Sequence, residues 1–434
     1  MAGEDEDRIS SLPSELKVSI LARLEVKDAI RASALARSWR HLWTFCPRLR
    51  LGCADDPLGD YGNRGRTVAS SWIERAHHVV SSLRGPLLHF ELAHFFSSHQ
   101  FSLLQLLLDL LLLKGPVKKL RLYCLLDCGA IHLPSFHSLE KLFLYGCRIV
   151  LPADFREFDR LSSLTLCSVQ ISNDHLHLLL HSSNNLTTFK AFSIVALDDQ
   201  PVSIKLNLPL LRHLDFQLGK FVEKVEFFTP SLEQANFWSF GDSGSEEVVS
   251  VNLVLVTMVT SVVMVSSLSL HHDVLKYLSL AALPSNFTFP RLTCLKLFLN
   301  AQTMDKRMLD TFIWLLQSMP LLKALDIELH DYDYYTNKDR VDILMRELLV
   351  NKHDGISCLN RTLKSVRIKM HTLNSVMTII TLVKFLLLNA RVLEIMKVAY
   401  WTGSEVDPSM LEVLQNAKVT TSSKAEVVIS ECNC

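Results

Sequence analysis

The chain has 434 residues, and its 45 basic and 45 acidic side chains give a formal net charge of zero. That balance argues against binding to nucleic acid or to an anionic membrane through bulk charge. Hydrophobic residues make up 49% of the sequence, which is enough for a large core and leaves apolar surface for a partner. The length predicts either several domains or one elongated repeat domain.

The first predicted elements are three short helices within residues 7–51. Pro13 suits the first turn of a helix. Leu16, Ile20 and Leu24 recur at helical spacing and predict one apolar face. A core this small usually shares its apolar surface with another protein or domain.

This segment resembles an F-box. The matching positions are both apolar and polar: Leu12, Pro13, Glu15, Leu16, Ile20, Leu21, Leu24, Lys27, Asp28, Ala29, Arg31, Ser33, Trp39 and Arg40. It departs from the family at Glu25, where a proline is usual, and at Arg37 and Ser38, where a basic pair is usual. The resemblance implies docking on a Skp-type adaptor through Leu12, Pro13, Leu16, Ile20, Leu24, Ile30, Leu35 and Trp39. The alternative is a plain three-helix cap on the repeats that follow.

Leucine-rich repeats are predicted after this module. Apolar residues recur at i, i+3 and i+5 in triples that begin at Leu87, Val117, Leu139, Leu161, Leu186, Leu211, Leu232, Leu275, Leu292, Leu322, Leu363 and Leu393. A proline stands two residues before the first leucine in four of them, at Pro209, Pro230, Pro290 and Pro320. Most triples start 17 to 30 residues apart, around the leucine-rich-repeat period.

The triples predict an α/β solenoid. Residues i+3 and i+5 face the same side of a short strand, so neighbouring strands form a parallel sheet on the concave face. Helices are expected on the convex face, for example at Met308–Leu316 and Val341–Leu348. The pattern resembles an irregular leucine-rich-repeat protein. The signature Asn or Cys after the strand stands at Cys147 and is missing from most repeats.

Two uncharged segments need interpretation. Phe101–Leu113 is rich in leucine but short, and predicts a buried or amphipathic helix. Val248–Leu270 is uncharged for longer, yet its valines alternate with small polar residues, which favours strands over a membrane span. A further repeat beginning at Val251 is expected there.

The last segment, residues 357–434, predicts strand, helix and strand in a continuation of the solenoid. It resembles the FBD region that follows leucine-rich repeats in a large group of plant F-box proteins. The motif residues begin at Leu363 and at Lys384, while His371 stands where the family often has an aromatic-glycine turn. The domain assignment is F-box 7–51, a linker leading into the solenoid 52–86, repeats 87–356 and the FBD-like region 357–434.

Catalytic and metal-binding motifs are absent from the sequence. Phosphate-loop, dinucleotide, zincin and hydrolase-elbow signatures do not occur. The adjacent pairs His77–His78 and His271–His272 would point to opposite sides of a strand and suit a shared metal poorly. The cysteines contain no CxxC pair, which together with the acidic N-terminus predicts reduced thiols in the cytoplasm or nucleus. No cofactor or metal is expected.

The resemblance implies a binding protein and not an enzyme. An F-box followed by leucine-rich repeats is expected to be the substrate-recognition subunit of an SCF-type (cullin-RING) ubiquitin ligase, bound to a Skp-type adaptor and through it to a cullin. The repeats would hold an unknown protein target, with no nucleic acid or membrane as partner. Outward-facing strand residues predict a target surface at Lys119, Arg121, Tyr123, Lys141, Phe143, Tyr145 and Trp238. The alternatives are an interaction scaffold without a ligase role and an enzyme hidden in the solenoid.

Overall fold

The structure is a computed structural model with two compact units, Met1–Leu211 and Arg212–Cys434. It describes residues 9, 11–24, 26–34, 37–52, 70–94, 101–124, 129–197, 202–218, 222–239, 257, 259, 261–281, 283–284, 286–300, 305–330, 356–370, 376–401 and 424–432.

The N-terminal helices of the first unit are α1 (Ser14–Leu21), α2 (Val26–Ala32) and two 3₁₀ turns, η1 (Arg37–Trp39) and η2 (Leu42–Phe45). The predicted third helix is thus broken in two, because His41 adopts a left-handed φ of 66° between the turns. A small core holds the module together, consisting of Leu21, Ala29, Trp39 and Cys46.

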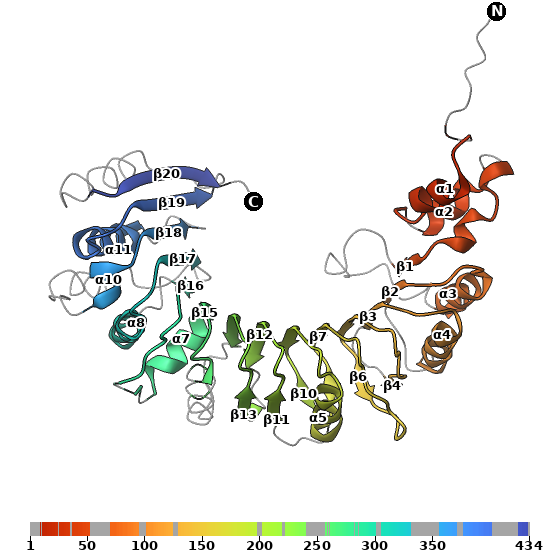
Figure 1. The fold of residues 1–434 in the computed structure, drawn as a ribbon, viewed down its shortest axis with the longest axis horizontal. Coiled ribbons are helices and arrows are strands. Elements are labelled where there is room, and N and C mark those ends of the chain that lie inside the picture. Colours follow the sequence, from red (N-terminus) through yellow and green to blue (C-terminus); the bar gives the residue numbers. More distant parts are fainter. Residues whose placement is uncertain are drawn as a thin grey trace, which may run out of the picture. The chain divides into compact units, whose positions relative to one another are not determined.

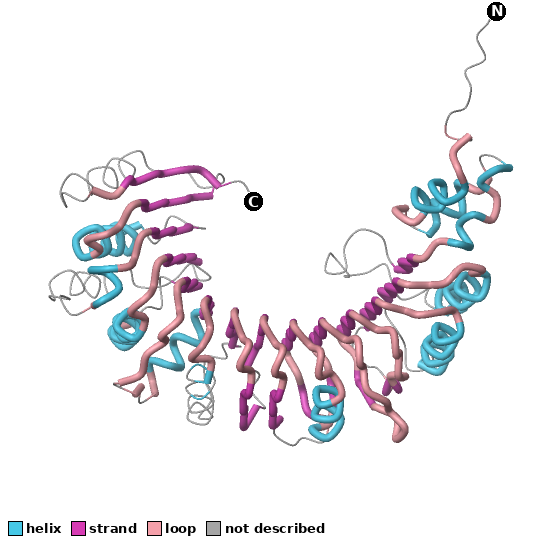
Figure 2. The backbone as a smooth tube through the Cα atoms, viewed as in Figure 1, coloured by secondary structure: helices cyan, strands magenta, loops and turns pink. Residues whose placement is uncertain are grey.

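The first unit then builds a parallel sheet with strands in the order β1 (Arg48–Gly52), β2 (His89–His94), β3 (Lys119–Cys124), β5 (Lys141–Tyr145), β7 (Ser163–Cys167) and β9 (Thr188–Phe192). Strands line the concave side and helices α3 (Ser70–Ser82), α4 (Phe101–Leu113) and α5 (Asn173–His181) the convex side (Figures 1 and 2). The leucines at i+3 and i+5 are buried as predicted, Leu142 and Leu164 among them.

A second row of short parallel strands follows the first: β4 (Ala130–His132), β6 (Arg148–Val150), β8 (Gln170–Ile171) and β10 (Val195–Ala196). A left-handed residue makes the turn between the rows, at Gly146, Ser168 and Ser193, with φ of 66°, 51° and 52°. The next residue is buried and is Cys147, Val169 or Ile194, so no ladder of asparagines forms in these repeats. Strand β11 (Val202–Asn207) comes last in the unit.

The second unit is also built from a parallel sheet and helices. Its parallel sheet runs β12 (His213–Leu218), β14 (Gln234–Ser239), β15 (Ser267–His271), β16 (Cys294–Asn300), β17 (Ala324–His330), β18 (Ser365–Met370), β19 (Ile395–Trp401) and β20 (Glu426–Cys432). The other elements are β13 (Val222–Phe228), α7 (His272–Ser279), α8 (Lys306–Ser318), α10 (Ser357–Arg361) and α11 (Val376–Asn389). Both α8 and the strand–helix–strand order of the last segment agree with the sequence prediction.

The triple at Leu275 is a correction to the sequence analysis. It lies in α7, because Val274, Leu275 and Leu278 recur at helical spacing and are buried on one face. The strand of this repeat is β15, which supplies the apolar residues Leu268 and Leu270. Residues 251–256 and 341–348, where a repeat and a helix were predicted, lie outside the described residues.

Further corrections concern the start of the sheet and one histidine pair. The sheet begins at Arg48, inside the range 7–51 and not at residue 87, because Leu49 and Leu51 alternate with Arg48 and Arg50 and bury one side of a strand. His77 and its neighbour lie in α3 and not on a strand. Within the described helices, none is long and apolar enough to cross a membrane.

Candidate functional site

An apolar face of α1 points away from the N-terminal core. Leu16 and Ile20 lie one helical turn apart with 52% and 41% of their surfaces exposed, whereas Leu21, on the opposite side, is 1% exposed. Leaving two large aliphatic side chains in water costs free energy that burial against a partner would recover. This face can therefore serve as a docking surface.

The other residues predicted for adaptor binding differ in accessibility. Pro13 and Leu24 are exposed, while Leu12 and Ile30 are half-buried. Trp39 is 8% exposed and belongs to the core, so its role is to support the face from within. The Lys17 ammonium lies 5.9 Å from the centroid of a Trp39 ring. Leu35 lies outside the described residues.

The N-terminal module is joined directly to the sheet. The backbone carbonyl of Thr44 accepts hydrogen bonds from the amides of Arg84 and Gly85, and that of Pro47 accepts from Leu88 and His89. Gly85 allows this approach, because a Cβ there would lie only 3.0 Å from the Cα of Phe45. The η2 turn is followed after two residues by β1, so the docking face and the first strands lie in the same compact unit.

The predicted basic and aromatic residues of β3 and β5 do come together on the concave side. The Arg121 guanidinium lies 5.1 Å from the Phe143 ring centroid and 5.8 Å from that of Tyr123. Tyr123 contacts Phe143 and Tyr145, with centroids 4.8 and 6.2 Å apart. Burial raises the pKa of Tyr123. A cation over a ladder of rings is a typical anchor for a protein partner.

Trp238 belongs to the second unit and forms a different cluster. Its ring stacks on His271, which in turn stacks on Phe298 with centroids 4.0 Å apart and an interplanar angle of 9°. The Lys296 ammonium lies 4.2 Å from the centroid of the Phe298 ring. Three adjacent strands thus present a second aromatic surface, of which Trp238 was among the predicted target-binding residues.

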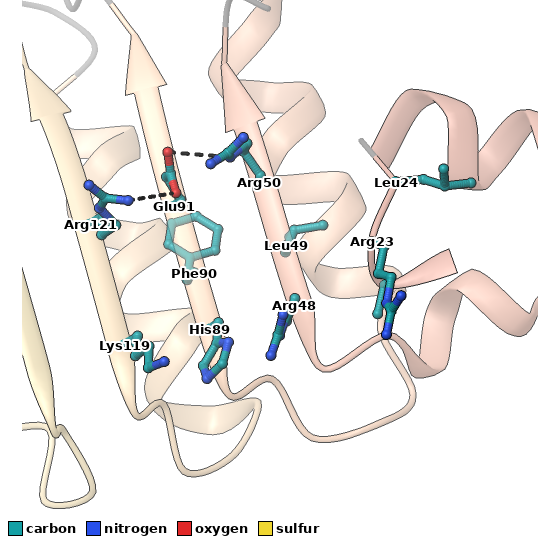
Figure 3. A pocket seen from close by; sticks show the side chains of 11 residues that line it. Arg23, Leu24, Arg48, Leu49, Arg50, His89, Phe90, Glu91, Lys119 and Arg121 are labelled. Atoms are coloured by element: carbon teal, nitrogen blue, oxygen red, sulfur yellow. Dashed lines mark ion pairs between the residues drawn. The ribbon is translucent and has the colours of Figure 1, made fainter. Parts of the chain in front are cut away.

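A cavity of about 450 Å³ lies between the N-terminal module and the first strands of the sheet (Figure 3). Its lining is rich in cationic side chains and is formed by Ala22, Arg23, Leu24, Arg48, Leu49, Arg50, His89, Phe90, Glu91, Lys119 and Arg121. Glu91 is the single acid among them. Its Oε1 lies 3.4 Å from Arg50 Nε, and its Oε2 lies 3.6 Å from Arg121 Nη1.

Most of this cavity was missed in the sequence analysis. Arg48 and Arg50 were assigned to the N-terminal module, although Cys46, Leu49 and Leu51 fit the same i, i+3, i+5 pattern as the later strands. That triple was the signal that could have placed both arginines on the concave face.

The described residues contain no group of three or more metal-ligating side chains. Burial raises the pKa of the Cys46, Cys167 and Cys358 thiols to about 11, so these cysteines are not activated nucleophiles.

Comparison with known proteins shows similarity to two protein families. The model of the F-box domain matches residues 9–51, and the model of the leucine-rich repeats of the FBD-associated F-box protein At5g56370 matches residues 105–257. The N-terminal segment of the chain is therefore similar to an F-box, and a later segment is similar to the leucine-rich repeats of an F-box protein. The F-box match covers the module from α1 to η2 and most of β1, and the repeat match covers strands β3 to β14. The assignment of residues 357–434 as an FBD region stays a prediction.

Several Arabidopsis thaliana proteins are similar to this chain. The F-box/FBD/LRR-repeat protein At2g04230 is 37% identical over 84 residues, which are 19% of this chain and 18% of the relative. The F-box/FBD/LRR-repeat protein At1g13570 is 27% identical over 234 residues, 53% of each chain. The FBD-associated F-box protein At5g60610 is 24% identical over 390 residues, 84% of this chain and 93% of the relative. The chain thus matches about half or less of the length of the first two relatives.

Proposed function

We propose that this protein is the substrate-recognition subunit of an SCF-type ubiquitin ligase. The F-box docks on a Skp-type adaptor, which links it to a cullin, and the concave faces of the repeats hold a protein target. The observation that carries this proposal is the exposed pair Leu16 and Ile20 on a module that matches the F-box family. Transfer of ubiquitin is left to other subunits, and this chain contributes proximity between target and conjugating enzyme.

The adaptor-binding step is tested by co-purification. The tagged full chain is co-expressed with a Skp-type adaptor and a cullin, and the double variant Leu16→Ala/Ile20→Ala is compared with it. We expect the variant to lose both partners while its thermal unfolding stays near that of the parent, because both side chains are exposed. The matched control is Leu178→Ala, an equally exposed leucine on α5.

A point variant serves better than removal of the F-box. Deleting residues 1–50 would take away most of β1 and expose the edge of β2, so loss of binding could come from a damaged sheet. Full adaptor binding by the double variant would contradict the assignment of this face. Failure of the parent chain to recover adaptor or cullin would instead favour an interaction scaffold without a ligase role.

A further inference from the structure

One row of the concave sheet is basic across its first four strands. In the parallel register Arg48 pairs with His89, His89 with Lys119, and Lys119 with Lys141. Four adjacent strands therefore place four basic side chains side by side, at the strand spacing of roughly 4.8 Å. The row ends at β7, where the residue opposite Lys141 is Ser163. Arg23 of the F-box lies in the same cavity lining (Figure 3).

Like charges placed opposite one another destabilise a sheet, and the neighbouring row shows how this chain offsets such repulsion. There Glu91 stands between Arg50 and Arg121 and pairs with both. In the basic row, Arg48, Lys119 and Lys141 form no ion pair with an acid of the described chain. The nearby Glu140 is paired with Lys118 at 2.9 Å.

The electrostatic effect of the row is visible at His89. Its pKa is lowered first by burial and then by the positive charges of Lys119 and Arg48. The negative charge of Glu140 raises this pKa, but by less. The share of this shift that comes from Lys119 and Arg48 reflects a positive potential in the cavity, and a positive potential favours an anionic ligand.

We propose that the row Arg48–His89–Lys119–Lys141, with Arg23 at its end, binds an acidic segment of the target protein. This inference rests on the proposed function and names the chemistry of the target. Three strand spacings cover roughly 14 Å, the length of four or five residues of extended chain at about 3.3 Å each. Asp or Glu carboxylates along such a segment would meet the cationic groups of Arg48, Lys119 and Lys141. The rings of Tyr123 and Phe143, in the rows beside it, offer an apolar border.

The test uses the full chain purified with its adaptor and a fluorescein-labelled octaglutamate peptide, followed by fluorescence anisotropy. The control peptide is octaglutamine, which has the same length without charge. We expect the acidic peptide alone to bind, and Arg48→Gln and Lys119→Gln each to weaken it about tenfold, the effect of losing a charge-assisted hydrogen bond. Arg148→Gln, which removes an exposed cation from β6 in the second row of strands, should leave binding unchanged.

Two results would overturn the proposal. One is that the two peptides bind equally well, or that the acidic peptide binds the parent and the variants equally well. The other is tight binding of inorganic tripolyphosphate that octaglutamate does not displace, which would assign the row to a small polyanion. Retained adaptor in the same samples shows that the F-box still docks, so either result would leave the proposed function standing. The Gln variants should melt no earlier than the parent, because they relieve repulsion.

Discussion

The imidazole of His271 lies parallel to the ring of Phe298, with centroids 4.0 Å apart. Burial, reinforced by Lys296 and His330, lowers the pKa of His271 to about 3, and burial lowers that of His272 to about 4. Both histidines are therefore neutral in the folded protein at pH values where an unfolded chain would protonate them.

The first prediction is an acid-sensitive second unit. Between pH 6.5 and about 4 the unfolded state binds more protons at these two sites, so stability is complete above pH 6.5 and falls as the pH decreases. The loss is at most about 1.4 kcal/mol per pH unit for each histidine, and less for His271 because solvent reaches part of it. Urea unfolding at pH 7.5 and 5.5 measures the difference.

The matched variants for this prediction are His271→Gln and His181→Gln. The first should reduce the stability difference between the two pH values, because a group that titrates in the unfolded state is removed. The second replaces an exposed histidine of α5 and should leave the difference as it is. An unchanged difference in His271→Gln would refute the role of this imidazole.

The second prediction separates the two kinds of F-box residue. Trp39→Ala should destabilise the module by about 3–5 kcal/mol, because the indole is part of a small core. Leu16→Ala should change stability by no more than about 0.5 kcal/mol, as exposed positions do. Thermal melts of both variants, set beside adaptor co-purification, distinguish loss of folding from loss of the docking surface. Similar melts for the two would contradict the assignment of Trp39 to the core.

The third prediction concerns the register of the repeats. Alanine at Leu142, Leu164, Leu214, Leu295 or Leu325 should cost about 2–5 kcal/mol, since each side chain is at most 1% exposed. Lys141→Ala is the control and should lie within about 0.5 kcal/mol of the parent. A costly Lys141→Ala, measured by chemical denaturation, would mean that the strands face the other way.

Three other surface positions are less tolerant than alternation alone predicts. The side chain of Asp215 accepts a hydrogen bond from Asn236, Lys296 lies 3.3 Å from Glu328, and Asp326 lies 3.5 Å from Arg367. Alanine at these positions removes a cross-strand partner and leaves the other group uncompensated. We therefore expect losses larger than at Lys141, by up to about 1 kcal/mol for the ion pairs.

The fourth prediction concerns the left-handed turn between the two rows of strands. Gly146→Ala should destabilise the first unit by about 1 kcal/mol, because φ is 66° there and a Cβ is unfavourable in this region. Ser168→Gly at the equivalent turn should be neutral or stabilising for the same reason. Equilibrium unfolding of both variants provides the comparison. Equal effects of the two changes would show that the turn does not depend on this conformation.

The strands were predictable because apolar and polar residues alternate in the sequence of each repeat. Leu142 and Leu164 alternate with polar neighbours, and alternation fixes which side of a strand is buried. At Leu275 the same spacing also fits a helix, and the valine and leucines of α7 recur every three or four residues.

The basic row was only partly predictable. Lys119 and Lys141 follow from the triples on either side of them, whereas Arg48 and His89 required β1 and β2 to be recognised as the first strands. Lateral register between strands is a property of the assembled sheet, so no local pattern places Arg48 opposite His89.

The continuity of η2 with β1 has a consequence for how a bound target would be presented. The carbonyls of Thr44 and Pro47 tie the F-box to the segment before β2, so the F-box and the first strands are joined by hydrogen bonds as well as by the covalent chain. A target seated on the basic row would be held close to the F-box, because Arg23 lines the same cavity as that row. Which of its lysines meet the conjugating enzyme would then be decided by where they lie on the target's surface, and rearranging those lysines would spare the target without weakening its binding.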